Sequence, residues 1–169
     1  MSAQTVIDSL EFARAAQELR GRLPVTNLVR LQDCLVDADG SVDFVVKGGR
    51  DAERRPILAL EISGLLHLQC QGCLGPLDYP LQLSNTLLLV RRGEDLGADA
   101  DDPEAADCIE ADPALDLAPL IEDEILLSLP FAPRHADGSC QSVLSAMRRE
   151  GSAPAAFAKL AALKKGSGQ

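Results

Sequence analysis

Two pairs of cysteine and histidine residues are the parts of this sequence best suited to chemistry. Cys70 and Cys73 form a Cys-x-x-Cys motif, and His135 and Cys140 follow with the spacing His-x4-Cys. Thiolate and imidazole are preferred ligands of zinc, and four of them complete a closed tetrahedral site. A lone Cys-x-x-Cys motif is a weak signal, which the second pair strengthens. These four residues are therefore candidate ligands of a zinc knuckle.

Two other interpretations of the same residues stay open. In one, all four occupy ordinary structural positions and bind no metal. In the other, Cys70 and Cys73 form a redox dithiol or a metal-dependent reactive centre. Redox dithiols usually begin a helix that follows a strand, whereas this motif lies between two strand-like segments. The sequence thus leaves zinc and the metal-free interpretation open and disfavours the redox pair.

The other histidine and cysteines fit structural roles. His67 alternates to the side opposite Leu66 and Leu68, which predicts a surface histidine rather than a metal ligand. Cys34 and Cys108 lie in apolar, strand-like segments. We expect both to be small core residues.

Signatures of catalysis are missing from the sequence. It contains no glycine-rich phosphate loop, no Gly-x-Ser-x-Gly elbow and no His-Glu-x-x-His helix. Only two histidines are present, which limits acid–base schemes. The acidic side chains of the loop at about 93–107 are expected to be solvated and ionised, with nothing to shift their pKa. We therefore expect no catalytic residues and a protein that is not an enzyme.

Two arginine doublets are candidate contacts for nucleic acid or a protein partner. Arg54 and Arg55 precede one strand-like segment, and Arg91 and Arg92 follow the next. If the chain reverses at Cys70–Cys73, the doublets lie near each other at the open end of a hairpin. Like charges that face each other across a sheet repel, so an anion is expected nearby. RNA phosphate and the acidic segment of this chain are both candidates, and the alternative is a set of solvated strand ends.

The apolar pattern indicates the elements that position these groups. Asp8 and Glu11 resemble a capping box and predict a helix from about Ser9 to Arg20. A second helix is predicted to begin after Asp116 and to end before Pro130.

Extended segments account for much of the remaining pattern. They are predicted over Val25–Val36, Val42–Val46, Pro56–Cys70 and Leu77–Val90. The last two form one long antiparallel hairpin, because the glycines and the proline between them favour a reversal with the cysteines at its tip. Within the first hairpin strand one face is apolar, formed by Leu58, Leu60, Ile62, Leu66 and Leu68.

These elements predict an α+β fold, with an antiparallel sheet built around the long hairpin and helices packed on one side. We expect one domain over residues 1–150, with a mobile acidic loop at about 93–107. Residues 151–169 are expected to form a C-terminal tail with a short helix.

The charge of the chain is distributed unevenly. The net charge is -10, yet thirteen acidic residues and no Lys or Arg lie between Gly93 and Pro133, so the rest of the chain sums to +3. A protein that met RNA by bulk attraction alone would not be acidic. Any contact with nucleic acid must be local or made through a protein partner.

Other features of composition bear on location. No apolar run is long enough to cross a bilayer, and the N-terminus lacks the layout of a signal peptide. The five cysteines are a sparse and odd set, which favours the reducing cytoplasm. We expect no membrane partner.

Motifs in three segments, Leu68–Pro76, Asp116–Pro130 and Pro133–Cys140, together resemble the YceD family, the large ribosomal RNA subunit accumulation proteins. Leu68–Pro76 is similar to the family's Cys-x-Arg-Cys-Leu-x-Pro signature, with Gly72 in place of the arginine. Asp116–Pro130 looks like its acidic helix that runs into Leu-x-Leu-Pro, and Pro133–Cys140 resembles the Pro-x-His…Cys segment after it. With both ends of the chain also similar, the resemblance covers nearly the whole sequence.

The resemblance implies a bacterial, non-enzymatic factor in ribosome biogenesis. Such a factor supports the synthesis, processing or stability of large-subunit ribosomal RNA. Its partner would be a ribosomal precursor particle or an rRNA-processing protein, with weak direct RNA contact at most. Other members carry cysteines after the Leu-Pro block, which implies a metal cluster with the hairpin tip. The rivals are a thiol redox or metal-dependent protein that uses Cys70 and Cys73, and an acidic adaptor that contacts only proteins.

Overall fold

The computed structural model describes residues 5–91, 93, 107–136 and 140. They fall into two units, a larger one from Met1–Leu68 and Asp78–Pro130 and a smaller one from Gln69–Leu77 and Phe131–Gln169. Most of the expected acidic loop, the expected tail helix and Arg92 lie outside the described residues.

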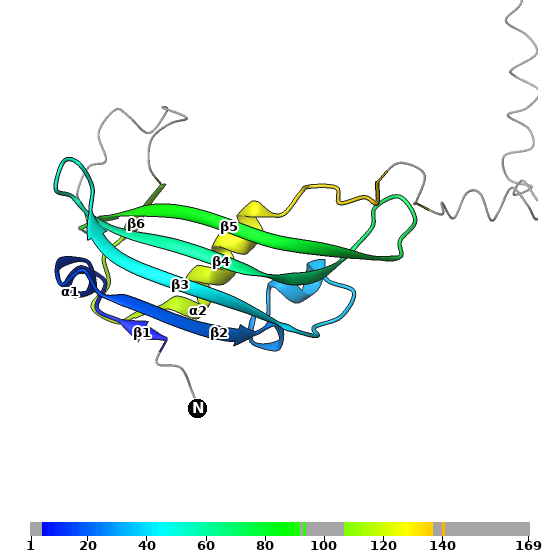
Figure 1. Cartoon of the computed structure of the whole chain (residues 1–169), viewed down its shortest axis with the longest axis horizontal. Coiled ribbons are helices and arrows are strands. Elements are labelled where there is room, and N and C mark those ends of the chain that lie inside the picture. The colour runs from blue at the N-terminus through cyan, green and yellow to red at the C-terminus, as the bar shows by residue number, and fades with distance from the viewer. Residues whose placement is uncertain (1–4, 92, 94–106, 137–139, 141–169) are drawn as a thin grey trace, which may run out of the picture. The chain divides into compact units, whose positions relative to one another are not determined.

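The larger unit contains a five-stranded sheet in the order β2-β3-β4-β5-β6 and a separate pair, β1-β7 (Figure 1). The strands are β1 (Val6–Ile7), β2 (Glu18–Pro24), β3 (Ser41–Arg50), β4 (Pro56–Gln69), β5 (Pro76–Val90), β6 (Asp107–Glu110) and β7 (Leu115–Asp116). The helices are α1 (Ser9–Arg14), α2 (Leu117–Ser128) and the 3-10 helices η1 (Val25–Asn27) and η2 (Leu31–Cys34). Long β4 and β5 are neighbours in the sheet and confirm the predicted hairpin.

The predicted α+β class is confirmed, with one refinement. β2 pairs with β3, and β3 with β4, in antiparallel fashion. The edge strand β6 runs parallel to β5, with Leu87 opposite Asp107. The sheet is therefore mixed rather than wholly antiparallel.

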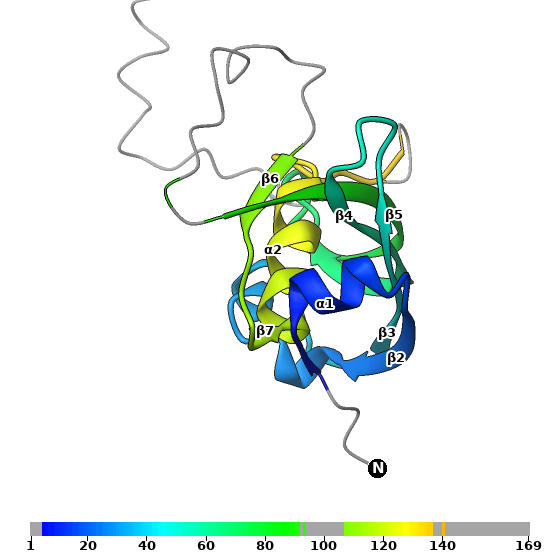
Figure 2. The same cartoon turned by 90° about the vertical axis from the view of Figure 1, so that its left-hand side faces the viewer.

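One face of the sheet forms the core of the larger unit. The apolar face predicted for β4 is confirmed, since its residues are at most 2% exposed: Leu58, Leu60, Ile62, Leu66 and Leu68. Helix α2 crosses this side of the sheet, and α1 lies on the same side (Figures 1 and 2). From α2, Leu117, Ile121 and Ile125 are fully buried. Burying a side chain of this kind contributes roughly 1.5–3 kcal/mol, so this apolar contact holds the two layers together.

Helix α2 matches its sequence signals. The Asp116 side chain accepts a hydrogen bond from the Ala118 N–H at 3.1 Å and caps the first turn. The helix ends at Ser128, and Leu129 is already extended. Pro130 follows, and a residue that precedes proline avoids the helical conformation. None of the described helices has the length and apolarity needed to span a membrane.

The helix predicted from Ser9 to Arg20 is wrong in its second half. α1 ends at Arg14, and Ala16 takes a left-handed conformation with φ 48°. The following residues form β2, in which Leu19 pairs with Val46. A Cβ at Gly21 would lie 2.5 Å from the Phe44 ring, so this glycine lets β2 approach β3. Pairing with β3 therefore outweighs the helical spacing of the apolar residues.

The strand predicted over Val25–Val36 is also wrong, because this segment forms η1 and η2. Its buried residues recur every three positions, at Val25, Leu28 and Leu31, a spacing that matches the three residues per turn of a 3-10 helix.

Two further expectations fail, because Cys34 and Cys108 are exposed rather than core residues. Cys34 ends η2, whose buried side chain is Leu31. Cys108 lies on β6, the edge strand of the sheet. Strand-like sequence did not distinguish an edge from an interior position.

Candidate metal centre

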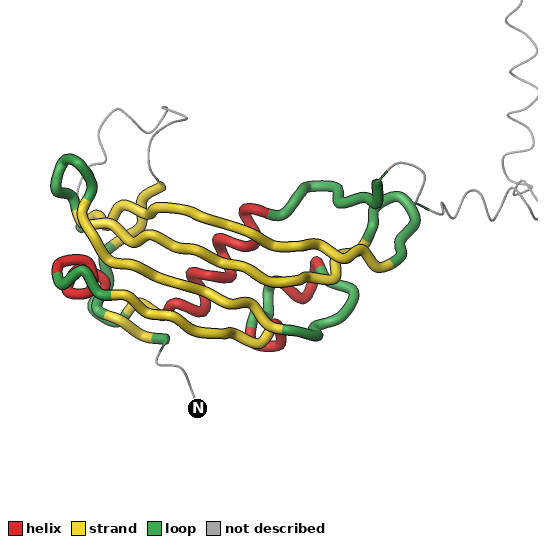
Figure 3. Tube along the Cα trace, in the orientation of Figure 1, coloured by secondary structure: helices red, strands yellow, loops and turns green. Residues whose placement is uncertain are grey.

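A tight loop after β4 presents the Cys-x-x-Cys motif (Figure 3). The Cys70 N–H donates to the Gly75 carbonyl at 2.9 Å, and the Leu74 N–H donates to the Cys70 carbonyl at 2.8 Å. Leu74 takes a left-handed conformation with φ 60°, which reverses the chain. Both cysteines thus belong to one hydrogen-bonded turn.

The segment after α2 is bonded to this turn at two points. The Gln71 N–H donates to the Pro133 carbonyl at 2.8 Å. His135 Nε2 lies 2.9 Å from the Pro76 carbonyl oxygen. These bonds bring the second predicted pair of ligands to the first, although some sixty residues separate them in the chain.

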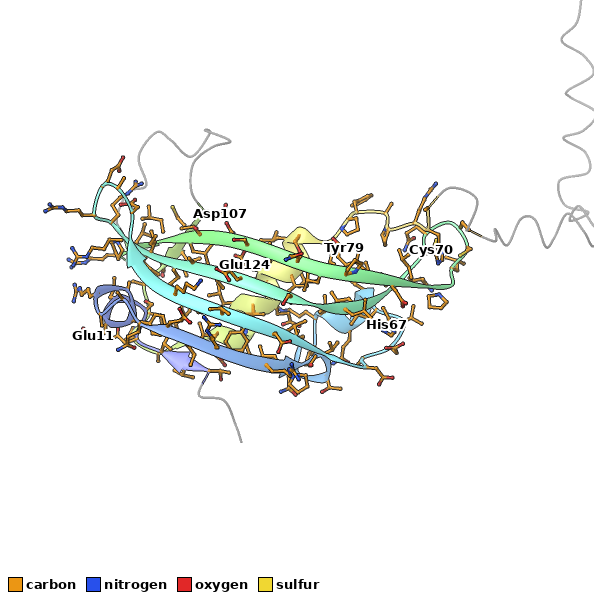
Figure 4. The ribbon with its side chains drawn as sticks, viewed as in Figure 1. Glu11, His67, Cys70, Tyr79, Asp107 and Glu124 are labelled. Carbon is orange, nitrogen blue, oxygen red and sulfur yellow. The ribbon has the colours of Figure 1, made fainter. Side chains whose placement is uncertain are left out.

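The four predicted ligand residues form one cluster. Their ligand atoms, from Cys70, Cys73, His135 and Cys140, all lie within 4.8 Å of one another. The Cys70 and Cys140 sulfurs are 3.6 Å apart, and the Cys73 sulfur is 3.5 Å from His135 Nδ1. Cys70 is buried and the other three are half-buried. Cys70 is labelled in Figure 4.

Two of these distances match the edges of a tetrahedral metal site. With Zn–S bonds of about 2.3 Å and Zn–N bonds of about 2.0–2.1 Å, the tetrahedron has S–S edges of about 3.8 Å and S–N edges of about 3.5 Å. The observed separations of 3.6 and 3.5 Å are close to both values. A donor set of three sulfurs and one imidazole nitrogen is typical of structural zinc. The cluster can therefore hold a zinc ion.

The bond to Pro76 assigns the tautomer of His135. Because a carbonyl oxygen only accepts, Nε2 must carry the proton that it donates. Nδ1, the nitrogen that faces the Cys73 sulfur, is then free of a proton in the neutral ring. Metal-binding histidines are commonly oriented in this way, with the second nitrogen bonded to a carbonyl.

The pKa values of two thiols in the cluster are shifted in opposite directions. Burial raises the pKa of Cys70, but hydrogen bonds from the backbone of His135, Cys73 and Gly72 outweigh it and bring the pKa down to about 5. Burial, hydrogen bonding and repulsion by the Cys70 and Cys73 sulfurs raise the pKa of Cys140 to about 11. Without a cation the three sulfurs cannot all ionise near neutral pH. A divalent cation at their centre would remove this conflict.

Gly72 makes room for the fourth ligand. A Cβ at this position would lie 2.9 Å from the Cys140 sulfur, which is closer than side chains pack. The Gly72 N–H also donates to the Cys70 sulfur at 3.4 Å. The residue that departs from the arginine of the family signature thus contacts two of the four candidate ligands.

The arginines predicted to bind an anion lie in the larger unit. Arg54, Arg55 and Arg91 line one pocket of about 380 Å³. Two further arginines, which the sequence pattern had not indicated, also line it: Arg14 and Arg50. Arg14 lies in the last turn of α1 and would have been found only from the packing of α1 against β3. Arg50 directly precedes the turn that carries Arg54, so its position in the sequence could have indicated it as a further residue of the pocket.

His67 lies outside the metal cluster, in the larger unit. Its Nδ1 is 3.2 Å from an oxygen of Asp37, and its side chain is 31% exposed. Asp37 also accepts from the Asp39 N–H in the turn before β3. The geometry agrees with a histidine at the surface.

Buried carboxylates of α2 have structural partners. Glu124 accepts a hydrogen bond from the Asn85 side chain at 2.7 Å, and the same amide donates to Asp107 at 3.0 Å. Glu122 is bonded to Arg30 and Leu31. In the part of the chain that is described, no buried side-chain nitrogen or oxygen lacks a hydrogen bond.

Comparison with known proteins places the chain in a family. The family model described as "Large ribosomal RNA subunit accumulation protein YceD" matches residues 58–164, more than half of the chain. A protein of that name from Haemophilus influenzae is 27% identical over 142 residues, which cover 80% of this chain and 77% of the relative. No solved structure matches. The matched segment contains nearly all of the hairpin, the whole of α2 and all four residues of the metal cluster. This chain belongs to the YceD family.

Proposed function

We propose that this protein is a non-enzymatic, cytoplasmic factor of bacterial ribosome biogenesis that supports the accumulation of large-subunit ribosomal RNA. The observation that carries the proposal is the family match over residues 58–164, together with the printed name of the relative. The factor acts on the synthesis, processing or stability of that RNA.

The use of the buried acidic groups supports a role without catalysis. General acid–base catalysis needs a carboxylate that is free to exchange a proton with a substrate. Glu122 and Glu124, the buried carboxylates of α2, instead accept hydrogen bonds from the protein itself. Hydrogen bonding within the fold is therefore enough to explain why both carboxylates are buried.

The metal cluster has a structural role in this proposal. Zinc bound by Cys70, Cys73, His135 and Cys140 would fix the hairpin loop to the segment after α2. The resulting zinc knuckle presents a rigid surface to a ribosomal precursor particle or an rRNA-processing protein. With a net charge of -10, recruitment through such a partner is expected over tight binding to bare RNA.

A deletion strain tests this function. Its large-to-small ribosomal RNA ratio should fall, and a plasmid copy of the gene should restore it. A copy with Cys70→Ser and Cys73→Ser should restore it poorly. The matched control carries Cys34→Ser and Cys108→Ser, which alter two exposed cysteines outside the cluster. A normal ratio in the deletion strain, during slow and fast growth alike, would refute the proposed role.

One observation favours a second candidate, a thiol redox function of Cys70 and Cys73. The pKa of Cys70, about 5, makes this thiol a thiolate at neutral pH. A redox thiol should react fast with iodoacetamide in the protein as purified from cells. A zinc ligand should react only after the metal is removed. Fast alkylation of the purified protein before any chelator is added would favour the redox candidate.

A further inference from the structure

Five arginines converge on one pocket of the larger unit. They come from three separate stretches of chain: the end of α1, the segment from the end of β3 to the start of β4, and the end of β5. The arginines are Arg14, Arg50, Arg54, Arg55 and Arg91. The pocket has a volume of about 380 Å³, which is within the size range of small-molecule sites. Apolar side chains complete it, among them Leu10, Pro56 and Leu88.

The turn between β3 and β4 holds its arginines in a fixed arrangement. The Asp51 carboxylate accepts from the N–H groups of Glu53 and Arg55, at 2.9 and 2.8 Å. The Arg54 N–H donates to the Asp51 carbonyl at 3.0 Å. Arg54 itself takes a left-handed conformation with φ 66°, which is unfavourable for a residue with a side chain. Turns usually place glycine at such a position, so the arginine side chain is retained at a cost.

The charges of this pocket are only partly neutralised. Arg55 pairs with Asp51 at 2.7 Å and with Glu53 at 3.2 Å. Across the described chain, no ion pair or side-chain hydrogen bond involves the guanidinium groups of Arg14, Arg50 or Arg54. Like charges gathered around one concave site repel unless an anion lies between them.

The shape of the site selects among anions. Guanidinium groups match the geometry of phosphate oxygens and can bind them in bidentate fashion. The arginines converge on one pocket and do not line an extended groove, which suits a compact group of phosphates better than a continuous RNA backbone. The apolar residues beside them can pack against a ribose or a base. We propose that this pocket binds the phosphorylated end of a nucleotide, either free or at the 5′ end of an RNA strand.

The assignment of the bound phosphates to an RNA end rests on the proposed function. The assignment of the pocket to phosphate groups does not. The acidic character of the whole chain is compatible with such a site, because its long-range field is screened within about 8–10 Å at physiological salt. Binding through a local pocket also agrees with the expectation of weak affinity for bare ribosomal RNA.

Titration calorimetry with the full-length protein tests the proposal. The probes are GTP and one short oligoribonucleotide made with a 5′-triphosphate or with a 5′-hydroxyl end. We expect binding that depends on the terminal phosphates. Tighter binding of the triphosphorylated oligonucleotide than of GTP assigns the source to RNA, and equal or weaker binding assigns it to a free nucleotide.

Two triple variants separate the pocket from the overall charge. Arg14→Gln, Arg50→Gln and Arg54→Gln together should weaken binding by roughly tenfold for each arginine lost. The control removes three cations outside the pocket lining, Arg20, Arg22 and Lys47, each replaced by Gln. These three are exposed and form surface ion pairs with Glu18, Asp43 and Glu61. The control should keep its affinity within about twofold.

A single variant distinguishes a binding role of Arg54 from a structural one. Arg54→Gly removes the guanidinium and relieves the left-handed backbone. It should weaken GTP or oligonucleotide binding while the urea midpoint stays at or above that of the parent protein. Binding that ignores the 5′-phosphates, or equal losses in both triple variants, would overturn the proposal. Since these are measurements on purified protein, they are independent of the ribosomal RNA ratio that tests the proposed function.

Discussion

Glu122 on α2 is bonded to Arg30 through both the backbone and the side chain of the arginine. Its carboxylate accepts from the Arg30 N–H at 2.6 Å and from the Arg30 Nε at 2.9 Å. The same group accepts from the Leu31 N–H at 3.1 Å. The segment between η1 and η2 is therefore fixed to α2 by one buried carboxylate. The acidic stretch of the family's helix signature has a structural explanation here.

Replacing Glu122 should destabilise the larger unit. Glu122→Ala leaves two backbone N–H groups without their acceptor, which we expect to lower the free energy of unfolding by about 2–4 kcal/mol. Asp123→Ala is the matched control, because Asp123 pairs with the same Arg30 at 2.5 Å but is half exposed. For Asp123→Ala the loss in the free energy of unfolding should stay below about 1 kcal/mol. Urea denaturation of both variants measures the difference, and equal losses would contradict the assignment.

The sequence predicted those elements whose apolar spacing agrees with their tertiary contacts. In β4 the buried apolar residues alternate with more exposed ones, and α2 has both an aspartate cap and a proline after its end, so local and global signals coincide. Around Leu19 the same apolar residues fit a helical period and an alternating one. Pairing with β3 favours the strand, and the sequence alone does not reveal that pairing.

The candidate metal centre was predictable because its ligand types are rare and their spacing is informative. The arginine pocket was predictable only in part. Arg54, Arg55 and Arg91 flank the hairpin strands, but Arg14 reaches the site through the packing of α1. The exposure of Cys108 followed from β6 being an edge strand that runs parallel to β5, for which the sequence carried no signal.

Protein purified without chelator should contain about one zinc ion per chain, because four ligands complete a closed site. Cys70→Ser should lower the zinc content well below one, whereas Cys34→Ser should leave it unchanged. Elemental analysis measures both. After chelation, hydrogen exchange should accelerate at the amides of Cys70, Gln71 and Leu74, whose acceptors lie within the smaller unit. Absence of zinc from the parent protein would refute this prediction.

Zinc affinity should rise with pH. In the metal-free protein the pKa of Cys140 is about 11, so this thiol must lose its proton when it binds zinc at neutral pH. Each proton released makes the apparent affinity about tenfold higher per pH unit. Cys70, with a pKa of about 5, is already ionised and adds nothing to this slope above pH 6.

Competition with a chelator, corrected for its own protonation, should give a slope of at least about one decade per pH unit between pH 6 and pH 8. Cys140→Ser is expected to lower the zinc affinity. It should also lower the slope by about one decade per pH unit, because one proton fewer is released on binding. An affinity that does not change with pH would mean that the ligands are already deprotonated without metal.

Two glycines of the hairpin loop offer a paired test of the metal geometry. A Cβ at Gly72 would lie 2.9 Å from the Cys140 sulfur, whereas one at Gly75 would lie 3.5 Å from the Cys73 sulfur, an ordinary contact. Gly72→Ala should therefore displace a ligand and weaken zinc binding by about tenfold or more, as changes beside metal ligands often do. Gly75→Ala should leave the affinity nearly unchanged, since its Cβ fits without movement. Chelator competition at one pH compares the two variants with the parent protein. Equal affinities for all three would show that Cys140 can move aside without loss, and that Gly72 is not needed to hold the fourth ligand in place.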